Sequence, residues 1–401
     1  MNRGGTQKIV IYGGTFDPPH RGHFALIRSA MKELDPAVLY VVPGLRSPFK
    51  DLPCAPFRER AAMLASGLAS AGLGGETRVK IDPFEVLRGR LTYTWRTVAY
   101  FRKKHPHARL YFLMGSDCFE TFHRWKNYRR VLANAGLLVG AREGFPLKNP
   151  RGLPFTRLKG NFPHLASTAL KTGIFAGFDQ PGLFESTRKH IAARGLYLAG
   201  LRRRVAALMT PARFGHTRQT ARLALELAVK YGADLQKTAE AALLHDAARD
   251  LGPRALAAYV LRYRLRFPAL KETLEKAPVL LHACVGADMA AKKFGVRDRA
   301  VLSAIRSHTL GSVSPGLLDK IIYVSDLAAA DRDFREARAV RELAFRDLDA
   351  AYAAANYVKL VYALKAGGWT HPESVAVLSH RVRYGTNASL KVWNSLLKKD
   401  K

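Results

Sequence analysis

Eleven consecutive residues near the start of the chain have the composition of a phosphate-binding turn. The string Gly13-Gly-Thr-Phe-Asp-Pro-Pro-His-Arg-Gly-His23 follows a short apolar run and precedes an apolar-periodic segment. Glycine lets a backbone approach a ligand phosphate closely, and two histidines three residues apart at a helix start face the same direction. Imidazoles near neutral pH donate hydrogen bonds to phosphate oxygens whose charge grows in a transition state. The string therefore predicts a site for chemistry on phosphate groups.

A second series of potential ligands lies in the other half of the chain. Histidines and aspartates recur there at the ends or in the middle of apolar helical segments: His216, His245, Asp246, His282, His308 and Asp326. A charged aspartate among apolar residues is costly unless it is paired or binds a cation. Separate helices can aim such side chains at one cavity, as helical bundles do when they bind metals. Imidazole with carboxylate, without thiolate, suits iron, manganese or another divalent ion.

The elements that must position these residues differ between the two halves. Short apolar runs at 8–12, 38–42, 79–81, 109–114 and 136–140 alternate with segments of helical period. This alternation predicts an α/β domain with a parallel sheet covered on both faces, and ligands beyond the carboxyl ends of its strands. From residue 201 onward, long segments rich in Ala, Leu and Arg predict an all-α module.

The chain's length and charge restrict its class. Its 401 residues predict more than one domain, and we expect domains at 1–198 and 199–385 followed by a basic tail at 386–401. The net charge of +33 attracts polyanions such as nucleotides, nucleic acid or an anionic membrane. Three widely spaced cysteines argue against a disulfide framework and a thiolate zinc site. No stretch approaches the roughly 18 apolar residues of a membrane span, so a cytoplasmic protein without a membrane partner is expected.

The first string and several later segments resemble the nicotinate mononucleotide adenylyltransferases of the nucleotidyltransferase superfamily. The similar segments fall in the same order along residues 8–197: 13–23, 57–64, 85–97, 114–117 and 165–171. The resemblance implies a Rossmann-like domain that transfers AMP from ATP to nicotinate mononucleotide. The products would be nicotinate adenine dinucleotide and pyrophosphate, with Mg²⁺ accompanying ATP.

This resemblance also implies roles for individual residues. His20 and His23 would be catalytic. ATP would be bound by Gly13, Gly14, Thr15, Phe16, Lys50, Gly115, Asp117, Ser167, Thr168 and Lys171. The mononucleotide would be bound by Thr92, Tyr93, Trp125 and Arg142. A core aromatic is the alternative interpretation of Trp125, and a helix cap is that of Asp117.

Three positions depart from the adenylyltransferase pattern. Phe49 replaces a histidine, Ala166 replaces a serine and Lys171 replaces an arginine. Lysine keeps the positive charge but lacks the planar fork that binds phosphate with two parallel hydrogen bonds.

The adjacent His245-Asp246, with a histidine upstream and an aspartate downstream, resembles the HD phosphohydrolase superfamily. The nearest group is the bacterial symmetrical bis(5′-nucleosyl)-tetraphosphatases, which would cut diadenosine tetraphosphate into two ADP. The resemblance implies a metal site with a catalytic, bridging Asp246, a phosphate-binding Arg249, and two divalent metals, iron or else manganese. Its ligands would be His216, His245, Asp246, His282, His308 and Asp326. Ala329 and Ala330 stand where that group has Glu-Pro.

The favoured interpretation is a bifunctional nucleotide enzyme. One alternative keeps the adenylyltransferase but gives the helical domain another nucleotide as substrate. A second alternative is a nucleic-acid-binding protein with degenerate sites, which the charge of +33 motivates. The sequence has no arginine-rich arm and no named nucleic-acid motif, so nucleic acid is not a required partner. No feature of the sequence specifies an oligomeric state.

Overall fold

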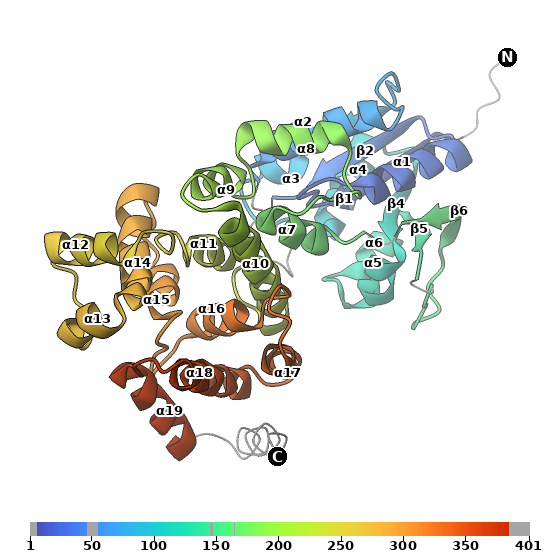
Figure 1. Ribbon diagram of the computed structural model, residues 1–401. Helices are drawn as coiled ribbons and strands as arrows, with labels where there is room; N and C mark the ends of the chain where they lie inside the picture. Colours follow the sequence, from blue (N-terminus) through green and yellow to red (C-terminus); the bar gives the residue numbers. More distant parts are fainter. Residues whose placement is uncertain (1–5, 46–54, 145–146, 164, 385–401) are drawn as a thin grey trace. The chain divides into compact units, whose positions relative to one another are not determined.

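The computed structural model describes residues 6–45, 55–144, 147–163 and 165–384 (Figure 1). The chain forms two compact units, one of Met1–Lys171 with Asp179–Tyr197 and one of Thr172–Phe178 with Leu198–Lys401. The division passes through helix α7 (Ser167–Ala176). The domain boundary at residue 198 stays a prediction. Phe49, Lys50 and the tail predicted at 386–401 lie outside the described residues.

The first unit is built on a six-stranded sheet in which all neighbouring strands are parallel. The strand order is β3-β2-β1-β4-β5-β6. The strands are β1 (Lys8–Gly14), β2 (Val38–Pro43), β3 (Val79–Ile81), β4 (Arg109–Gly115), β5 (Gly136–Arg142) and β6 (Thr156–Phe162). The predicted α/β fold class is confirmed. Strand β6 was not predicted, because it is a polar edge strand of which Leu158 and Phe162 are buried.

Helices cover both faces of this sheet, which explains why its strands are apolar without alternation. On β1, Val10 and Tyr12 belong to one hydrophobic cluster, whereas Ile9 and Ile11 belong to another. The first cluster includes side chains of α1 (Arg21–Leu34) and α2 (Phe57–Ser70). The second includes side chains of α4 (Thr94–Lys104), α5 (Ser116–Thr121) and α6 (Tyr128–Leu132). The other helical elements are α3 (Phe84–Leu87), η1 (Phe122–Arg124) and α8 (Glu185–Arg194).

The order of the strands creates a crevice at the carboxyl end of β1. The chain proceeds from β1 to β2 on one side, and β4 pairs with β1 on the other. The connections therefore leave this edge in opposite directions, which is the point where open α/β sheets bind ligands. The string from Gly13 to His23 starts there.

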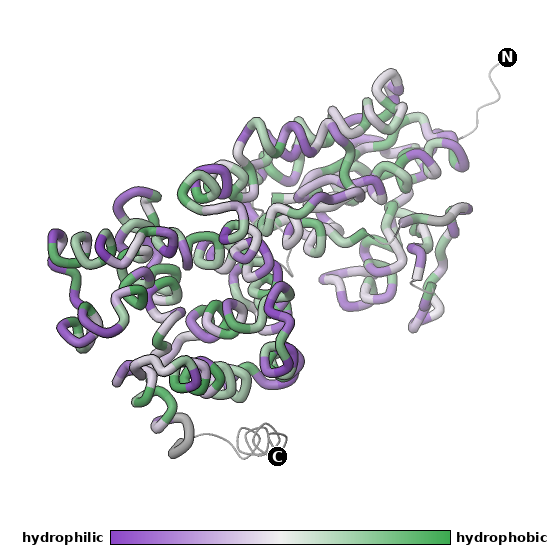
Figure 2. Tube along the Cα trace, viewed as in Figure 1, coloured by the Kyte–Doolittle hydropathy of each residue, from purple (hydrophilic) through white to green (hydrophobic). Residues whose placement is uncertain are grey.

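The second unit is helical, as predicted. Its elements are α9 (Ala199–Ala206), α10 (Pro211–Tyr231), α11 (Leu235–Leu244), α12 (Pro253–Tyr263), α13 (Leu270–Lys276), η2 (Pro278–Leu281), α14 (His282–Phe294), α15 (Arg299–Ser307), α16 (Leu317–Ala328), α17 (Arg335–Ala344), α18 (Leu348–Lys365) and α19 (Pro372–Tyr384). Figure 2 shows mostly hydrophobic residues along α18 and many hydrophilic ones along α17. Within the described part of the chain, no helix combines the length and apolar character that a membrane span requires.

Candidate functional site

A cavity of about 640 Å³ opens at the carboxyl end of the first unit's sheet, within the roughly 300–1,000 Å³ of small-molecule sites. It brings together every predicted adenylyltransferase residue that lies in the described part of the chain. These residues are Gly13, Gly14, Thr15, Phe16, His20, His23, Thr92, Tyr93, Gly115, Asp117, Trp125, Arg142, Ser167, Thr168 and Lys171. The crevice therefore gathers segments that are far apart in the sequence.

The two histidines of the first string form a stacked pair at the start of α1. Their ring centroids are 3.6 Å apart, and His20 and His23 are 1% and 8% exposed. The backbone N–H of His20 donates to Nδ1 of His23 at 3.1 Å, which leaves the hydrogen of a neutral His23 on Nε2. The first turn of a helix has unpaired N–H groups and the positive end of its dipole. This corner of the cavity is therefore suited to an anion.

Phe16 holds the turn between β1 and α1 in an unusual conformation. Its φ of 50° lies in the left-handed region that side chains other than glycine rarely adopt. Its ring packs edge-on against Tyr12 and His23, with centroids 5.3 and 4.9 Å apart. A Cβ on Gly14 would lie 3.0 Å from the same ring. The packing of the Phe16 ring thus holds the strained turn in place and orients the ring of His23.

Asp17 connects the first string to later parts of the first unit. Its side chain is 2% exposed and lies 3.3 Å from Nζ of Lys171. The Tyr197 hydroxyl donates to Oδ1 of Asp17 at 2.7 Å, and the Ala55 backbone N–H donates to the same oxygen at 3.1 Å. Lys171 therefore shares its charge between Asp17 and the cavity that it lines. Sequence reasoning gave no role to Asp17 or Tyr197, and Tyr197 has no local motif that signals one.

Arg142 and Asp117 form an ion pair at the ends of two adjacent strands. Nη1 of Arg142 lies 3.0 Å from Oδ2 of Asp117 and donates to the Leu165 carbonyl at 3.1 Å. The other oxygen, Oδ1 of Asp117, is buried and accepts no hydrogen bond within the described chain. A Cβ on Gly115 would lie 2.7 Å from that oxygen, so glycine is required there. The ion pair thus fixes the Asp117 carboxylate at the edge of the cavity that this residue lines.

An aromatic surface lines another side of the same cavity. Trp125 is half-buried and packs against Phe112 and Phe122, with ring centroids 6.2 and 5.3 Å apart. The Lys126 ammonium lies 4.8 Å from the centre of the Tyr93 ring. Trp125 thus packs on the core and also lines the cavity, and its role in binding the mononucleotide stays a prediction.

Glu85, which also lines this cavity, should make stability depend on pH. Burial raises the pKa of Glu85 from 4.5 to about 7, although Thr97 donates a hydrogen bond to the carboxyl at 2.5 Å. The folded chain then binds this proton more tightly than the unfolded chain, so stability falls as pH rises from about 5 to 7. Glu85→Gln stays neutral and keeps the acceptor for Thr97. We expect its stability relative to the parent to rise by about 2 kcal/mol between pH 5 and pH 8.

Thermal unfolding of both proteins across this pH range measures the effect. Glu120→Gln is the matched control, because the Glu120 side chain is 39% exposed. Parallel melting profiles for Glu85→Gln and the parent would show that Glu85 is ionised throughout.

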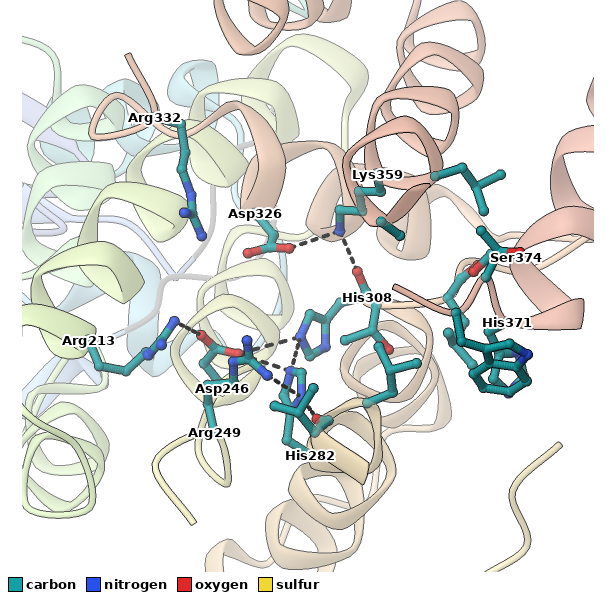
Figure 3. A pocket seen from close by; sticks show the side chains of 18 residues that line it. Arg213, Asp246, Arg249, His282, His308, Asp326, Arg332, Lys359, His371 and Ser374 are labelled. Atoms are coloured by element: carbon teal, nitrogen blue, oxygen red, sulfur yellow. Dashed lines mark hydrogen bonds and ion pairs between the residues drawn. The ribbon is translucent and has the colours of Figure 1, made fainter. Parts of the chain in front are cut away.

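The second unit contains a smaller cavity, of about 250 Å³, that is lined by four of the predicted ligands: Asp246, His282, His308 and Asp326 (Figure 3). Two groups of potential ligands share Asp246, with ligand atoms within 4.8 Å of one another in each group. The first group is His216, His245 and Asp246, and the second is Asp246, His282 and His308. Asp326 Oδ1 lies 3.1 Å from Nε2 of His216 and 3.7 Å from Nε2 of His245. The structure therefore brings all six predicted ligands together.

These ligands lie on three helices and directly after the ends of two others. His216 lies on α10, Asp326 lies near the end of α16, and His282 begins α14. His308 directly follows α15. The expectation that His245 and Asp246 lie inside a helix is wrong, because α11 ends at Leu244. The chain then tightens into turns with i to i−3 hydrogen bonds, which places Asp246 at the cavity and Nε2 of His245 within 3.7 Å of Asp326.

The hydrogen bonds of three histidines orient their Nε2 atoms toward the centre. In each, Nδ1 lies 2.6–2.7 Å from the carbonyl oxygen three residues earlier: His245 to Ala242, His282 to Val279, and His308 to Ile305. Since Nδ1–H donates there, Nε2 of each neutral ring carries a lone pair. Nε2 of His282 lies 3.0 Å from Nε2 of His308, and Nε2 of His245 is buried and makes no hydrogen bond with any residue that the structure describes. Converging lone pairs of this kind suit a bound cation.

Asp246 lies between the two groups of histidines. Its Oδ1 is 3.3 Å from Nε2 of His282 and 3.5 Å from Nε2 of His308. Its Oδ2 is 3.7 Å from Nε2 of His245 and 3.0 Å from Nη1 of Arg213. The two carboxylate oxygens thus face different ligand sets. Nitrogen and carboxylate donors in this arrangement fit a divalent transition metal.

The electrostatics favour the metal-binding protonation states of His245 and Asp246 but protonate His216. Burial lowers the pKa of His245 to about 4, so its ring is neutral. Burial opposes ionisation of Asp246, yet the neighbouring histidines hold its pKa well below the ordinary value. Burial also opposes the charge on His216, but Asp326 and Asp331 raise its pKa to about 9. A cation would take the place of that imidazole proton.

Asp331 should strengthen metal binding through His216. Its Oδ2 accepts a hydrogen bond from Nδ1 of His216 at 2.8 Å, which orients the ring and increases its basicity. We expect Asp331→Ala to weaken metal binding by about 10- to 100-fold, as measured by competition with a chelating dye. The control is Asp333→Ala, whose side chain is 79% exposed. Equal metal affinities for the two variants would exclude this role.

Sequence reasoning missed several charged residues of this cavity. Nζ of Lys359 donates to Oδ2 of Asp326 at 2.9 Å and to the His308 carbonyl at 2.7 Å. Arg213 and Arg332 line the cavity together with Arg249, whose guanidinium lies 3.4 Å from Nδ1 of His282. Arg213 lies three residues before His216, which is one helical turn and a usable signal. Lys359 lies on α18 and has no local signal.

Two protein families match separate parts of the chain. The cytidylyltransferase-like family matches residues 11–173, and the HD domain family matches residues 213–333. The first match contains all the residues that line the first unit's cavity. The second match contains the residues that line the second unit's cavity, except those on α18 and beyond.

Individual relatives resemble either the first unit or both. The chain is 26% identical over 329 residues to the "Probable nicotinate-nucleotide adenylyltransferase/Ap4A hydrolase" of Mycoplasma genitalium, covering 81% of this chain and 88% of that protein. It is 37% identical over 138 residues to the "Probable nicotinate-nucleotide adenylyltransferase" of Nitratiruptor sp., covering 34% and 75%. It is 32% identical over 197 residues to the protein of the same name from Chloroherpeton thalassium, covering 48% and 98%.

Proposed function

We propose that the chain performs two reactions on nucleotide phosphates. The premise is that it belongs to the nicotinate-nucleotide adenylyltransferase family and carries an HD domain in its second unit. The first unit makes nicotinate adenine dinucleotide from ATP and nicotinate mononucleotide. The second hydrolyses diadenosine tetraphosphate to two ADP at a site for two divalent metals. Both activities would operate in the cytoplasm, as the sequence predicts.

In the first reaction, an oxygen of the mononucleotide's 5′-phosphate forms a bond to the α-phosphorus of ATP. The bond from that phosphorus to the bridging oxygen breaks, and pyrophosphate leaves. No covalent enzyme intermediate is needed, so positioning and charge neutralisation carry the rate. The stacked His20 and His23 would donate to the triphosphate, and Mg²⁺ bound with ATP would neutralise further charge. The observation that carries this proposal is the buried histidine pair at the start of α1.

The other parts of the cavity have complementary roles. The start of α7, with Ser167 and Thr168, would bind phosphates through hydroxyl and backbone groups. The carboxylate of Asp117, which lines the cavity, would accept a hydrogen bond from a ribose hydroxyl. Trp125 would stack on the pyridine ring with its exposed face. Lys171 would contact phosphate as a point charge held in place by Asp17.

In the second reaction, water adds across the central phosphoanhydride bond of the tetraphosphate. The six ligands would hold two cations, iron or manganese, with Asp246 facing both groups. Cations held there would activate water near neutral pH and would neutralise charge on both sides of an in-line displacement. Arg213, Arg249, Arg332 and Lys359 would neutralise the phosphate chain. The observation that carries this proposal is the convergence of both histidine groups on Asp246.

Product analysis tests the second reaction. The full-length protein is incubated with diadenosine tetraphosphate and Mn²⁺ or Fe²⁺, without nicotinate mononucleotide, and nucleotides are separated by chromatography. We expect ADP as the sole product, and none after chelation of the metal. AMP together with ATP would contradict symmetrical cleavage, and an unchanged substrate would point to another nucleotide.

A further inference from the structure

The proposed hydrolysis uses only one side of the cavity in the second unit. Figure 3 shows Arg213, Arg249 and Arg332 on one side, and His371 and Ser374 on the opposite side. Lys359 and His308 lie between the two sides. The lining also contains apolar and aromatic residues to which the proposed hydrolysis gives no role: Val279, Leu280, Leu310, Leu360, Ala363 and Trp369. We refer to these six residues as the apolar wall.

Much of the apolar wall comes from elements beyond the residues that the HD family match covers. Leu360 and Ala363 lie on α18, on the same helix as Lys359. Ala363 lies one turn after Lys359, so it is about 6 Å further along the helix from the metal ligands. Trp369 follows in the turn before α19 and is half-buried. Chain outside the HD match therefore completes the cavity.

The turn that carries Trp369 is held firmly to its surroundings. His371 is 3% exposed, donates from Nε2 to the Pro268 carbonyl at 3.0 Å, and accepts from the Glu373 backbone N–H at 3.1 Å. Its ring centroid lies 5.2 Å from that of Trp369. The Ser374 hydroxyl donates to the Leu310 carbonyl at 3.1 Å. Both ring nitrogens of His371 are thus occupied, and the indole is positioned before any ligand binds.

A polar atom without a partner lies in the same cavity. Oγ1 of Thr309 is buried, and it makes no hydrogen bond within the described chain. Thr309 lines the cavity. A buried hydroxyl that lacks a partner is costly in the folded protein unless a ligand or water satisfies it. The cavity therefore combines an aromatic face and apolar contacts with one unfilled hydrogen-bonding position.

We propose that the apolar wall is a nucleobase subsite, in which the base stacks on Trp369 and bonds to the Thr309 hydroxyl at its edge. The inference rests on the proposed phosphohydrolase function, because the phosphates of the same nucleotide would occupy the cationic side. Apolar and aromatic linings with few polar groups are typical of sites for such rings. The cavity of about 250 Å³ is smaller than typical pockets, so the subsite would hold one base and leave the second nucleoside of a dinucleotide outside.

Photolabelling tests the subsite without relying on catalysis. The full-length protein is irradiated with 8-azido-ADP, and labelled peptides are mapped by mass spectrometry, which separates those of the two units. We expect a label within residues 359–376 that excess ADP removes, that Trp369→Ala loses and that Trp369→Phe retains. The control is Leu364→Ala, because Leu364 is 62% exposed in the same segment and does not line the cavity. The subsite proposal would be overturned if the second unit were not labelled, or if Trp369→Ala left its labelling unchanged.

Kinetics give a second readout that a structural role would not produce. Trp369→Ala should raise the KM for diadenosine tetraphosphate roughly tenfold with little change in kcat, and Trp369→Phe should restore most of it. Inhibition by inorganic tripolyphosphate, which has no base, should be unchanged in both variants. If Trp369→Ala weakened inhibition by tripolyphosphate as much as it raised the KM for diadenosine tetraphosphate, base binding by Trp369 would be contradicted. If the parent labels as expected but does not cleave diadenosine tetraphosphate, the base subsite stands and the proposed substrate is wrong.

Discussion

His20→Ala is expected to slow pyrophosphate release from ATP and nicotinate mononucleotide by about 100- to 1,000-fold, which is the usual effect of removing one preorganised donor from a developing charge. The reason is that His20 is buried at the start of α1, stacked on His23, and lines the cavity. Alanine removes the imidazole together with its part in capping α1, whereas the backbone N–H of residue 20 still donates to Nδ1 of His23. The loss should appear mainly in kcat, because the interaction strengthens as charge develops on the phosphates.

Two comparisons identify the cause of that loss. His107→Ala removes an exposed histidine of the same unit and should leave the rate unchanged. Hydrolysis of diadenosine tetraphosphate by His20→Ala should also be unchanged, because every proposed residue of that reaction lies in the second unit. A folded His20→Ala protein that retains the parent's transfer rate would refute the assigned role.

Asp246→Asn is expected to remove hydrolysis of diadenosine tetraphosphate by more than about 100-fold and to lower the metal content, while transfer continues. The carboxylate faces both histidine groups, with its oxygens 3.3–3.7 Å from three Nε2 atoms. Asparagine has nearly the same shape but no charge, and its amide NH₂ is not a metal ligand. Because even residues behind the ligands change metal affinity by about 10- to 100-fold, the shared ligand should matter more.

Metal content by atomic spectroscopy and product formation by chromatography measure this effect. The matched control is Asp288→Asn, since Asp288 pairs with Lys292 and Tyr259 away from the cavity. Full metal content in a folded Asp246→Asn protein would contradict the shared-ligand role. Loss of both activities in either Asp246→Asn or His20→Ala would contradict the independence of the two sites.

The parts of the fold that depend on local pattern were predictable from the sequence. Buried parallel strands read as continuous apolar runs, and five of the six strands were found in this way. The string from Gly13 to His23 is contiguous, so its position at the carboxyl end of β1 followed from a single segment. Strand β6 carries exposed Thr156, Arg157 and Lys159, and nothing local distinguishes it from a loop.

The predicted ligands of the second unit were recognisable because His and Asp are unusual among apolar residues. The residues that support these ligands were not recognisable, because their residue types are common at such positions in a sequence. Lys359 resembles any helix lysine until α18 packs beside α16, which brings its ammonium to Asp326. Asp331 needs the turn after α16 to reach His216. Trp369 becomes a cavity residue only through the anchoring of His371 to Pro268, 103 residues away in sequence.

Each sequence motif therefore predicts where a cavity lies, but it does not predict all of the residues that line or support that cavity. In the first unit, Tyr197 reaches Asp17 across 180 residues of sequence. Such contacts depend on the packing of whole elements, which local periodicity does not encode. Lys171, which replaces an arginine of the adenylyltransferase pattern, illustrates this point. Its ion pair with Asp17 joins two distant segments, so neither segment alone reveals it.

A crystal structure of the full-length protein with a non-hydrolysable ATP analogue and Mn²⁺ tests the central claim most directly. The claim is that one chain binds phosphate oxygens at two separate centres. We expect triphosphate density within hydrogen-bond distance of His20 and His23, and anomalous peaks for Mn²⁺ on both sides of Asp246. A triphosphate located away from both histidines, together with no anomalous peak among the six ligands of the second unit, would contradict the account.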